Sequence, residues 1–158
     1  MTAEAALITR FYTAFQQGDW ATMAACYHPE AHFSDPAFDL RGKQPAAMWR
    51  MLIEGATALE IRFNHVQGDR GEGSASWEAI YPFSQTGRTV HNRIQARFSF
   101  RDGLILRHED QFDFWAWSRM ALGAPGYLLG WSPLLRNKVR KMAAQRLGRF
   151  TEKHPEYR

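Results

Sequence analysis

The chain has 158 residues, of which 45% are apolar and 23% charged, and a formal net charge of +4. This length fits one domain with one well-packed core, and the composition is that of a soluble globular protein. The absence of any run of about 18 apolar residues excludes an integral membrane protein. The opening MTAEAALITRFY lacks the basic and apolar regions of a secretory signal, so we expect a cytoplasmic location.

The charge distribution and the cysteine content exclude further classes. Residues 131–158 hold eight Lys or Arg and two Glu, which leaves a net charge of −2 for residues 1–130. The chain is therefore a mildly acidic body with a basic tail, and its net charge does not indicate that the whole domain binds nucleic acid. The single cysteine, Cys26, cannot form an internal disulfide, and we expect it to be packed on a helix.

Two helices are predicted at the start of the chain. Apolar residues at helical spacing indicate a helix over residues 3–17. Gly18 is expected to end this helix and Asp19 to cap a short second one that runs through Tyr27. The His-Pro pair at 28–29 is expected to stop the second helix, because proline is unfavourable inside a helix.

A short strand and a third helix follow. The stretch AHFSDPAF, residues 31–38, has the pattern of a strand broken at Asp35-Pro36, because a residue before proline is pushed away from helical geometry. The third helix is predicted over residues 45–55, with proline near its start and glycine at its end.

The apolar period changes from 3.6 to 2 after residue 57, which predicts strands. The turn sequences GDRGEG, QTG and RDG separate the strands and are short and glycine-bearing, as hairpin loops require. The four predicted strands cover residues 59–67, 74–84, 89–100 and 104–115. Helices followed by an antiparallel meander indicate an α+β domain in which a curved sheet wraps the helices.

Residues 118–158 are predicted to be a basic C-terminal helical extension of a domain formed by residues 1–117. Ser132 is the expected cap of a long helix, with Pro133 at its first position. Its narrow apolar stripe favours packing on the domain or on a dimer mate. A lid and a membrane-surface contact are the alternatives, and the latter is supported by Tyr127, Leu128, Leu129 and Trp131. Binding to nucleic acid is not expected, because no aromatic platform accompanies the basic residues.

Two segments at the right separation carry a resemblance. FYTAFQQGDWATMAACYHPEAHFSDP and FSFRDGLILRHEDQFDF are similar to the opening and the closing hairpin of the nuclear transport factor 2-like superfamily, in its ketosteroid isomerase and polyketide cyclase branch. The resemblance covers about residues 5–117 and implies a cone-shaped sheet around three helices. It also implies a homodimer through the exposed sheet face, where Arg93, Gln95 and Arg97 would lie.

The resemblance makes Asp35 the first candidate for a general base, because ketosteroid isomerases use the aspartate of the corresponding Asp-Pro pair. The family's two oxyanion donors do not carry over. They fall at Phe11, which has no hydrogen to donate although Tyr12 is adjacent, and at Ala96. Without such donors the usual route of steroid isomerisation is not expected.

Strand periodicity predicts which side chains point inward. If Ala96 points inward, the inward residues of the two last strands are Asn92, Ile94, Phe98, Phe100, Leu106, His108, Asp110 and Phe112. His108 and Asp110 then lie side by side, and Asp35 approaches from the opening. A carboxylate in apolar surroundings gains proton affinity, as does an imidazole beside it, so this group predicts acid/base chemistry near neutral pH.

The predicted substrate is small and largely apolar, because most candidate lining residues are aromatic. The candidates for substrate contact are Tyr12, Trp49, Trp77, Tyr81, Asn92, Phe98 and Phe112. Isomerisation, cyclisation, dehydration and epoxide opening fit equally well. This chemistry needs no cofactor, and no metal site is expected because the His–Asp pair has no third ligand at convincing spacing.

Structural explanations compete with each of these assignments. Asp35 is also a common turn opener, His108 with Asp110 is also a buried polar pair that fixes strand register, and Asn92 can be a structural residue. The tryptophans can be core or interface residues. The alternative function is a non-catalytic module that binds a lipid-like ligand or a partner and uses its basic tail for docking.

Overall fold

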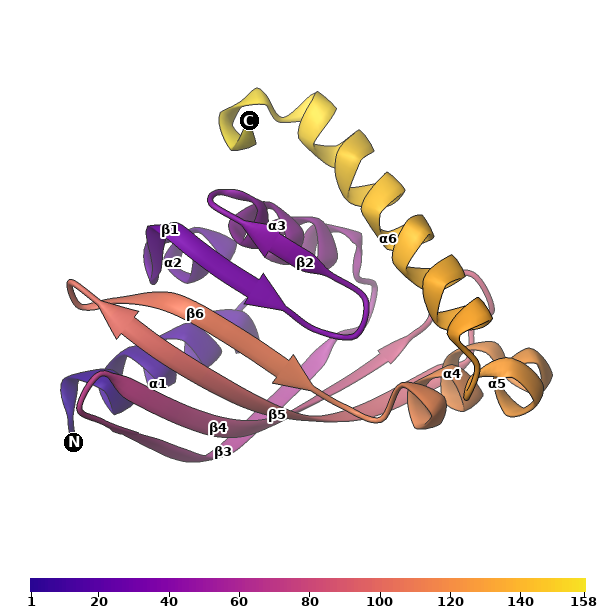
Figure 1. Cartoon of the computed structure of the whole chain (residues 1–158), viewed down its shortest axis with the longest axis horizontal. Coiled ribbons are helices and arrows are strands. Elements are labelled where there is room, and N and C mark those ends of the chain that lie inside the picture. The colour runs from indigo at the N-terminus through magenta and orange to yellow at the C-terminus, as the bar shows by residue number, and fades with distance from the viewer.

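The chain folds into a curved six-stranded sheet with helices on its concave side and a helical extension at one end (Figure 1). The computed structural model describes residues 1–158. The elements in chain order are α1 (Ala3–Gln16), α2 (Trp20–Ala25), β1 (Tyr27–Ser34), β2 (Asp39–Arg41), α3 (Gln44–Gly55), β3 (Glu60–Asp69), β4 (Glu72–Pro82), β5 (Thr89–Arg101), β6 (Leu104–Gln111), α4 (Phe114–Leu122), α5 (Ala124–Leu129), α6 (Pro133–Lys153) and the 3-10 helix η1 (Pro155–Tyr157).

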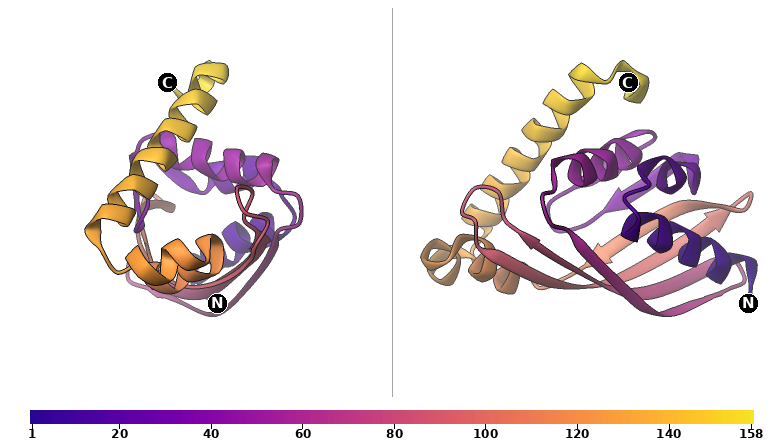
Figure 2. Two further views of the ribbon diagram at one scale, coloured as in Figure 1. Left: turned by 90° about the vertical axis from the view of Figure 1, so that its right-hand side faces the viewer. Right: turned by 180° about the vertical axis from the view of Figure 1, so that it is seen from behind.

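The strand order is β2-β1-β6-β5-β4-β3. All neighbouring strands are antiparallel except β1 and β6, which are parallel and place Phe33 opposite His108. The sheet curves around α1, α2 and α3 without closing on itself (Figure 2). These observations confirm the predicted α+β class and the β3–β6 meander. The parallel pair also brings the loop after β1, which contains Asp35, to the strand that carries Asp110.

Helix α1 lies against β3 and β4 and begins the core. Glycines in the facing strands permit the close approach: a Cβ added at Gly68 would lie 2.7 Å from Cβ of Glu4, and one at Gly73 would lie 2.6 Å from Cδ1 of Ile8. The helix turns one apolar face toward the sheet, as its spacing predicted. The buried side chains of α1 are Ile8, Phe11, Tyr12, Ala14 and Phe15.

The second helix is shorter than predicted, because it ends at Ala25 and the His-Pro pair lies inside β1. Tyr27 already pairs with Ile105 of β6, and the pairing of β1 shifts register between Tyr27 and His32. Proline is tolerated at such an irregularity because no ladder hydrogen bond is required from its nitrogen. Cys26 is buried at the C-cap of α2, and burial raises the pKa of its thiol to about 11.

Two predictions on the last strand are wrong. The strand ends at Gln111 instead of residue 115, because the Asp113 carboxylate accepts a hydrogen bond from the Ala116 amide at 3.0 Å and caps α4. The register between β5 and β6 shifts between Ser99 and Phe100. This irregularity turns Ile105 into the core in place of Leu106. From His108 onward the predicted inward orientation is correct.

The chain beyond β6 packs on both ends of the domain. α4 contributes to a small second core with Val90 of β5, and Leu147 of α6 is buried near α3. Pro133 starts α6 as predicted, but Ser132 does not cap it with its side chain. The Ser132 hydroxyl instead donates to the carbonyl oxygen of Leu129 at 2.6 Å.

Candidate functional site

A chain of hydrogen bonds crosses the interior from α3 to β4. Nε1 of Trp49 donates to the Tyr27 hydroxyl at 2.8 Å. The Tyr27 hydroxyl lies 2.8 Å from Nδ1 of His108, and Nε2 of His108 lies 3.0 Å from Oδ1 of Asp110. Nε1 of Trp77 donates to the same Asp110 oxygen at 3.3 Å. The chain thus joins five side chains from three strands and a helix.

The donors in this chain fix the protonation of His108. The Tyr27 oxygen already accepts from Trp49, so its own proton has Nδ1 of His108 as its acceptor. Nδ1 must then be unprotonated, and Nε2 carries the hydrogen that it donates to Asp110. A doubly protonated imidazole would leave the buried Tyr27 hydroxyl without an acceptor, which is unfavourable. The geometry therefore favours a neutral His108 beside an ionised Asp110.

Aromatic rings enclose His108 completely. The imidazole has no exposed surface, and the centroids of the Phe98 and Phe33 rings lie 4.4 Å and 4.9 Å from its own. Phe11 meets it edge-on at 5.6 Å. With both nitrogens bonded and no exposed edge, His108 reaches a ligand only through Asp110. Phe11 thus serves the packing of the imidazole.

Asp35 lies in the loop between β1 and β2, where its carboxylate closes a tight turn over Pro36. Oδ1 accepts hydrogen bonds from the amides of Ala37 and Phe38, both at 2.7 Å. The side chain is partly buried, and burial together with the nearby charge of Asp110 raises the pKa of the Asp35 carboxyl to about 7. The two amide bonds and the cation of Arg140 oppose this rise without cancelling it. Asp35 is thus both a turn former and a carboxyl that titrates near neutral pH.

Arg140 connects this loop to the C-terminal extension. Its Nε donates to the carbonyl oxygen of Pro36 at 2.9 Å, across 104 positions of sequence. The contact ties α6 to the residue that follows Asp35. No sequence pattern pointed to Arg140, because its partner lies 104 positions away along the chain.

The Tyr12 hydroxyl lies in the same interior without a hydrogen-bonding partner. Only two side-chain nitrogen or oxygen atoms are sealed from solvent and unpaired, namely this hydroxyl and Nε of Arg119. Burial and the charges of Asp110 and Tyr27 raise the pKa of Tyr12 well above its ordinary value, which places the phenol in the field of the Asp110 carboxylate. An unpaired buried donor is costly, which sets this hydroxyl apart from the paired hydroxyls of Tyr27 and Tyr81.

The other predicted contact residues surround the same interior. Tyr81 is near Asp35, whose charge raises the Tyr81 pKa after the larger effect of burial, and its hydroxyl accepts a hydrogen bond from Nε1 of Trp117 at 2.9 Å. Trp49, Trp77 and Phe98 are buried in the main core, and Phe112 packs against both cores. Asn92 is buried on the inner face of β5, opposite Ala79.

Two hollows of the surface lie away from the carboxylates. One, of about 690 Å³, is lined by the turn ends of β3 and β4 together with Arg97 and Arg107. The other, of about 650 Å³, lies between β5 and α4 and includes Asn92. Neither includes Asp35, His108 or Asp110, because aromatic rings fill the space around the imidazole. No cluster of three or more His, Cys, Asp or Glu side chains is placed to hold a metal ion.

Solved structures similar to this chain share its fold. An NTF2-like protein of unknown function from Burkholderia pseudomallei K96243 has a TM-score of 0.66 and 14% identity, over 77% of this chain and 99% of that one. A protein named as a SnoaL-like polyketide cyclase, from Jannaschia sp. CCS1, has a TM-score of 0.65 and 16% identity, over 78% and 93%. An LEH-like epoxide hydrolase of Mycobacterium tuberculosis has a TM-score of 0.61 and 20% identity, over 84% and 95%.

At these identities the structures establish the fold alone. No curated protein matches the chain in sequence. The family assignment comes from a family model, that of the SnoaL-like domain, which matches residues 8–108. This segment runs from the first buried residue of α1 to the imidazole at the centre of the hydrogen-bonded chain. The chain therefore belongs to the SnoaL-like domain family, within the nuclear transport factor 2-like fold.

Proposed function

We propose that the protein binds a small, largely apolar molecule between its sheet and helices and catalyses a proton transfer on it without a cofactor. The observation that carries this proposal is a pair of carboxylates, the partly buried Asp35 and the buried Asp110, which lie close enough for the charge of Asp110 to add to the effect of burial on the pKa of Asp35. In each of them Oδ1 accepts two hydrogen bonds, and Oδ2 takes no part in those bonds.

Asp35 is the proposed proton acceptor. A group whose pKa is about 7 is present in both forms at neutral pH, so it can remove a proton from a substrate and return it in a later step. Its Oδ1 is held by the Ala37 and Phe38 amides, which leaves Oδ2 as the atom that takes the proton. The rigid turn over Pro36 keeps this oxygen in place.

Asp110, His108 and Tyr12 have supporting roles in this proposal. His108 positions Asp110 and is not itself the acid, because both imidazole nitrogens are bound to neighbouring side chains. Asp110 keeps the proton affinity of Asp35 high through its charge. The unpaired Tyr12 hydroxyl is the donor for negative charge that develops on a substrate oxygen.

The reaction class follows from these groups. Asp35 removes a proton from a carbon next to a carbonyl, the C–H electron pair forms a carbon–carbon double bond, and the π pair of the carbonyl moves to its oxygen. Tyr12 donates a hydrogen bond to that oxygen. The proton then returns at another carbon, or the enolate carbon attacks a second carbonyl and closes a ring. Opening of an epoxide uses the same base: Asp35 removes a proton from water, the water oxygen attacks an epoxide carbon, and the ring C–O bond breaks. The proton held by Asp35 then goes to the alkoxide that this leaves, which gives a diol. The names of two similar structures, a polyketide cyclase and an epoxide hydrolase, support both classes.

The test is turnover of a panel of enolisable ketones, cyclisable polyketides and epoxides by the wild type and by Asp35→Asn. Asparagine keeps an oxygen for the Ala37 and Phe38 amides but cannot take the proton, so turnover should fall about 10²- to 10⁴-fold. The matched control is Asp39→Asn, which changes an exposed carboxylate four residues away. Equal turnover by the wild type and Asp35→Asn would overturn the role of Asp35.

Close packing around His108 favours a second candidate, a module that binds a lipid-like molecule without converting it. Aromatic rings pack against several sides of the imidazole. Neither of the two hollows described above lies beside Asp35 or Asp110. Native mass spectrometry of freshly purified protein distinguishes the two. A retained apolar ligand that survives incubation unchanged supports binding, and a ligand that is converted supports catalysis.

A further inference from the structure

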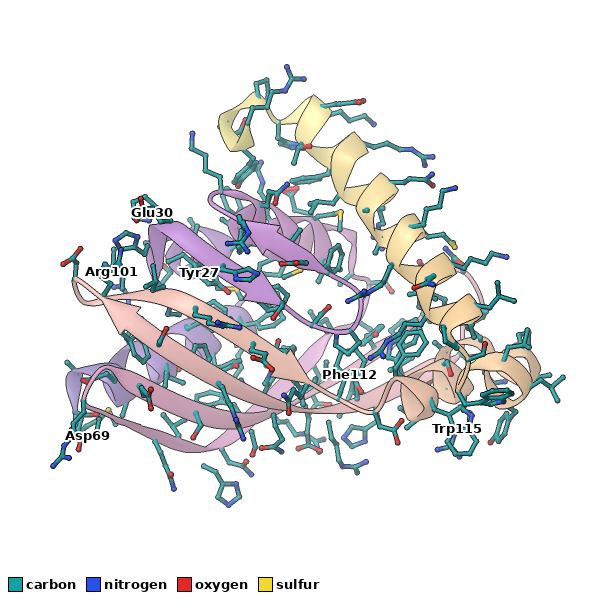
Figure 3. All side chains as sticks on the ribbon, in the orientation of Figure 1. Tyr27, Glu30, Asp69, Arg101, Phe112 and Trp115 are labelled. Atoms are coloured by element: carbon teal, nitrogen blue, oxygen red, sulfur yellow. The ribbon has the colours of Figure 1, made fainter.

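Large apolar side chains are exposed together at the end of the molecule formed by α4, α5 and the start of α6. Trp131, Leu134 and Leu128 are 72%, 71% and 70% exposed. Trp115 points away from the body of the molecule at this end (Figure 3). We name this surface the aromatic tip and define it by Trp115, Tyr127, Leu128, Leu129, Trp131 and Leu134.

The tip is held rigidly in this exposed arrangement. Gly126 and Gly130 lie so close to α4 that a Cβ at either would overlap atoms of Ser118, so α5 packs its small face inward and turns its large side chains outward. The indole of Trp131 donates from Nε1 to the carbonyl oxygen of Leu128 at 2.9 Å, which fixes its orientation. Exposure here is therefore a property of the packing and not of a loose loop.

The surroundings of the tip are basic. Residues 114–151 contain seven Lys or Arg and no acidic residue. The guanidinium of Arg119 lies 4.2 Å from the ring centre of Trp115 and 5.6 Å from that of Tyr127, and its Nε is buried without a partner. The guanidinium of Arg136 lies 5.7 Å from the ring of Phe114.

A basic hollow adjoins the tip. The hollow of about 650 Å³ between β5 and α4 is lined by Arg88, Arg93, Arg119 and Tyr127, with Asp113 as its acidic member. Glu78 offsets part of the charge of Arg93, at 3.6 Å from its Nε. Arg119 thus lines the hollow and also contacts Trp115 and Tyr127 of the tip, so its positive charge lies between the two surfaces.

This combination identifies the kind of partner. Exposed Trp and Tyr side chains with basic neighbours suit the boundary between lipid headgroups and acyl chains, where the rings enter the apolar layer and the cations meet phosphates. A second copy docked on the same surface would bring two basic surfaces together, and like charges at an interface oppose association. No helix has the length and apolarity needed to cross a membrane, so the contact is peripheral.

We propose that the aromatic tip docks the protein on the surface of a bilayer that contains anionic phospholipids. The tip lies at the opposite end of the sheet from the N-terminus, so docking is end-on and leaves the outer face of the sheet free (Figure 1). The inference does not depend on the chemistry proposed for Asp35.

The experiment is flotation of the full chain with vesicles of phosphatidylglycerol and phosphatidylcholine, and with vesicles of phosphatidylcholine alone. Binding is expected only to the first, and it should weaken as the ionic strength rises. The charge variant Arg136→Gln/Lys138→Gln should lose roughly thirtyfold in affinity. The control Arg70→Gln/Arg97→Gln, which removes two exposed arginines far from the tip, should bind as the wild type does.

The apolar variant Leu128→Ser/Trp131→Ser isolates the tip itself. Both side chains are exposed, so the variant should keep the wild-type circular dichroism while losing vesicle binding. Equal binding by this variant, equal binding to uncharged vesicles, or no binding to either kind of vesicle would overturn the proposal. A stable dimer in light scattering that only this variant dissociates would assign the tip to a second copy instead, and would also overturn it.

Discussion

The interior around His108 and the aromatic tip contain the same types of side chain, but these are buried in the interior and exposed at the tip. In the interior, Trp49 and Trp77 donate to Tyr27 and Asp110, and every ring is buried. At the tip, the Trp131 indole donates only to its own loop, and its ring faces solvent. Tryptophan therefore has no single role in this chain. What a tryptophan side chain does depends on whether its apolar surface is buried and on which polar groups lie next to it.

Ionisable groups differ between the two regions in the same way. Asp35 lies among covered apolar surface, where burial and a second carboxylate raise its pKa to about 7. Arg119 stacks on the exposed ring of Trp115 and retains its charge, because guanidinium groups stay protonated in proteins. The interior therefore favours proton exchange, and the tip presents fixed positive charge. Substitutions made in each of the two regions test this difference.

The largest difference in the free energy of unfolding is expected between a substitution of His108 and a substitution of Trp131. His108→Ala would leave a cavity among the rings and would remove the partners of the Tyr27 hydroxyl and the Asp110 carboxylate, so the free energy of unfolding should fall by about 3 kcal/mol. Trp131→Ala removes an exposed ring and should change it by less than about 0.5 kcal/mol. Urea unfolding of both variants measures the two values. Equal losses would contradict the division into a packed interior and an exposed tip.

A smaller effect is expected from the titration of Asp35. Its folded-state pKa of about 7 lies above the unfolded value, so the folded chain binds this proton more tightly and the associated stability is lost as the pH rises from about 4 to about 7. Asp35→Asn removes the cost of a buried charge. It should therefore raise the free energy of unfolding on the order of 2 kcal/mol at pH 8 and much less at pH 5. A stabilisation that is the same at both pH values would exclude this origin.

The smallest effect concerns Arg140, which links the C-terminal extension to the interior. Its charge lowers the pKa of Asp35, so Arg140→Gln should move that pKa upward. The substitution also removes a donor to the Pro36 carbonyl. The pH at which Asp35 titrates, followed by carbon NMR, measures the change. Lys141→Gln, which changes the next residue of α6, is the matched control, and an equal change in that variant would show that only the net charge matters.

Period-two patterning predicted that His108 and Asp110 share one face of the strand, and the resemblance to the family, through the inward position of Ala96, identified that face as the inner one. The prediction failed at Leu106, where a register shift exchanges the inward side, because no local pattern marks that irregularity. The end of the last strand was missed because the cap by Asp113 competes with continued pairing to β5. The first and third helices were predicted well because their spacing and their glycine or proline boundaries are local features, whereas the second helix ends two residues earlier than expected and α4 begins inside the predicted last strand.

Contacts between distant residues were beyond the reach of the sequence. Tyr27 was assigned to a helix end, and its bond to His108 depends on the parallel pairing of β1 with β6. The contact of Arg140 with Pro36 depends on the path of α6 over the domain. Asp35 was identified by resemblance to the family. Its pKa follows from burial and from the charge of Asp110, which no pattern of residues reports.

The central claim, that Asp35 and Asp110 interact as a pair of carboxylates in apolar surroundings, is tested most directly by carbon NMR titration of the Asp35 carboxyl. The wild type should titrate near pH 7, and Asp110→Asn should lower the midpoint, because a negative charge beside Asp35 is removed. A wild-type midpoint near 4 that Asp110→Asn leaves unchanged would contradict the account.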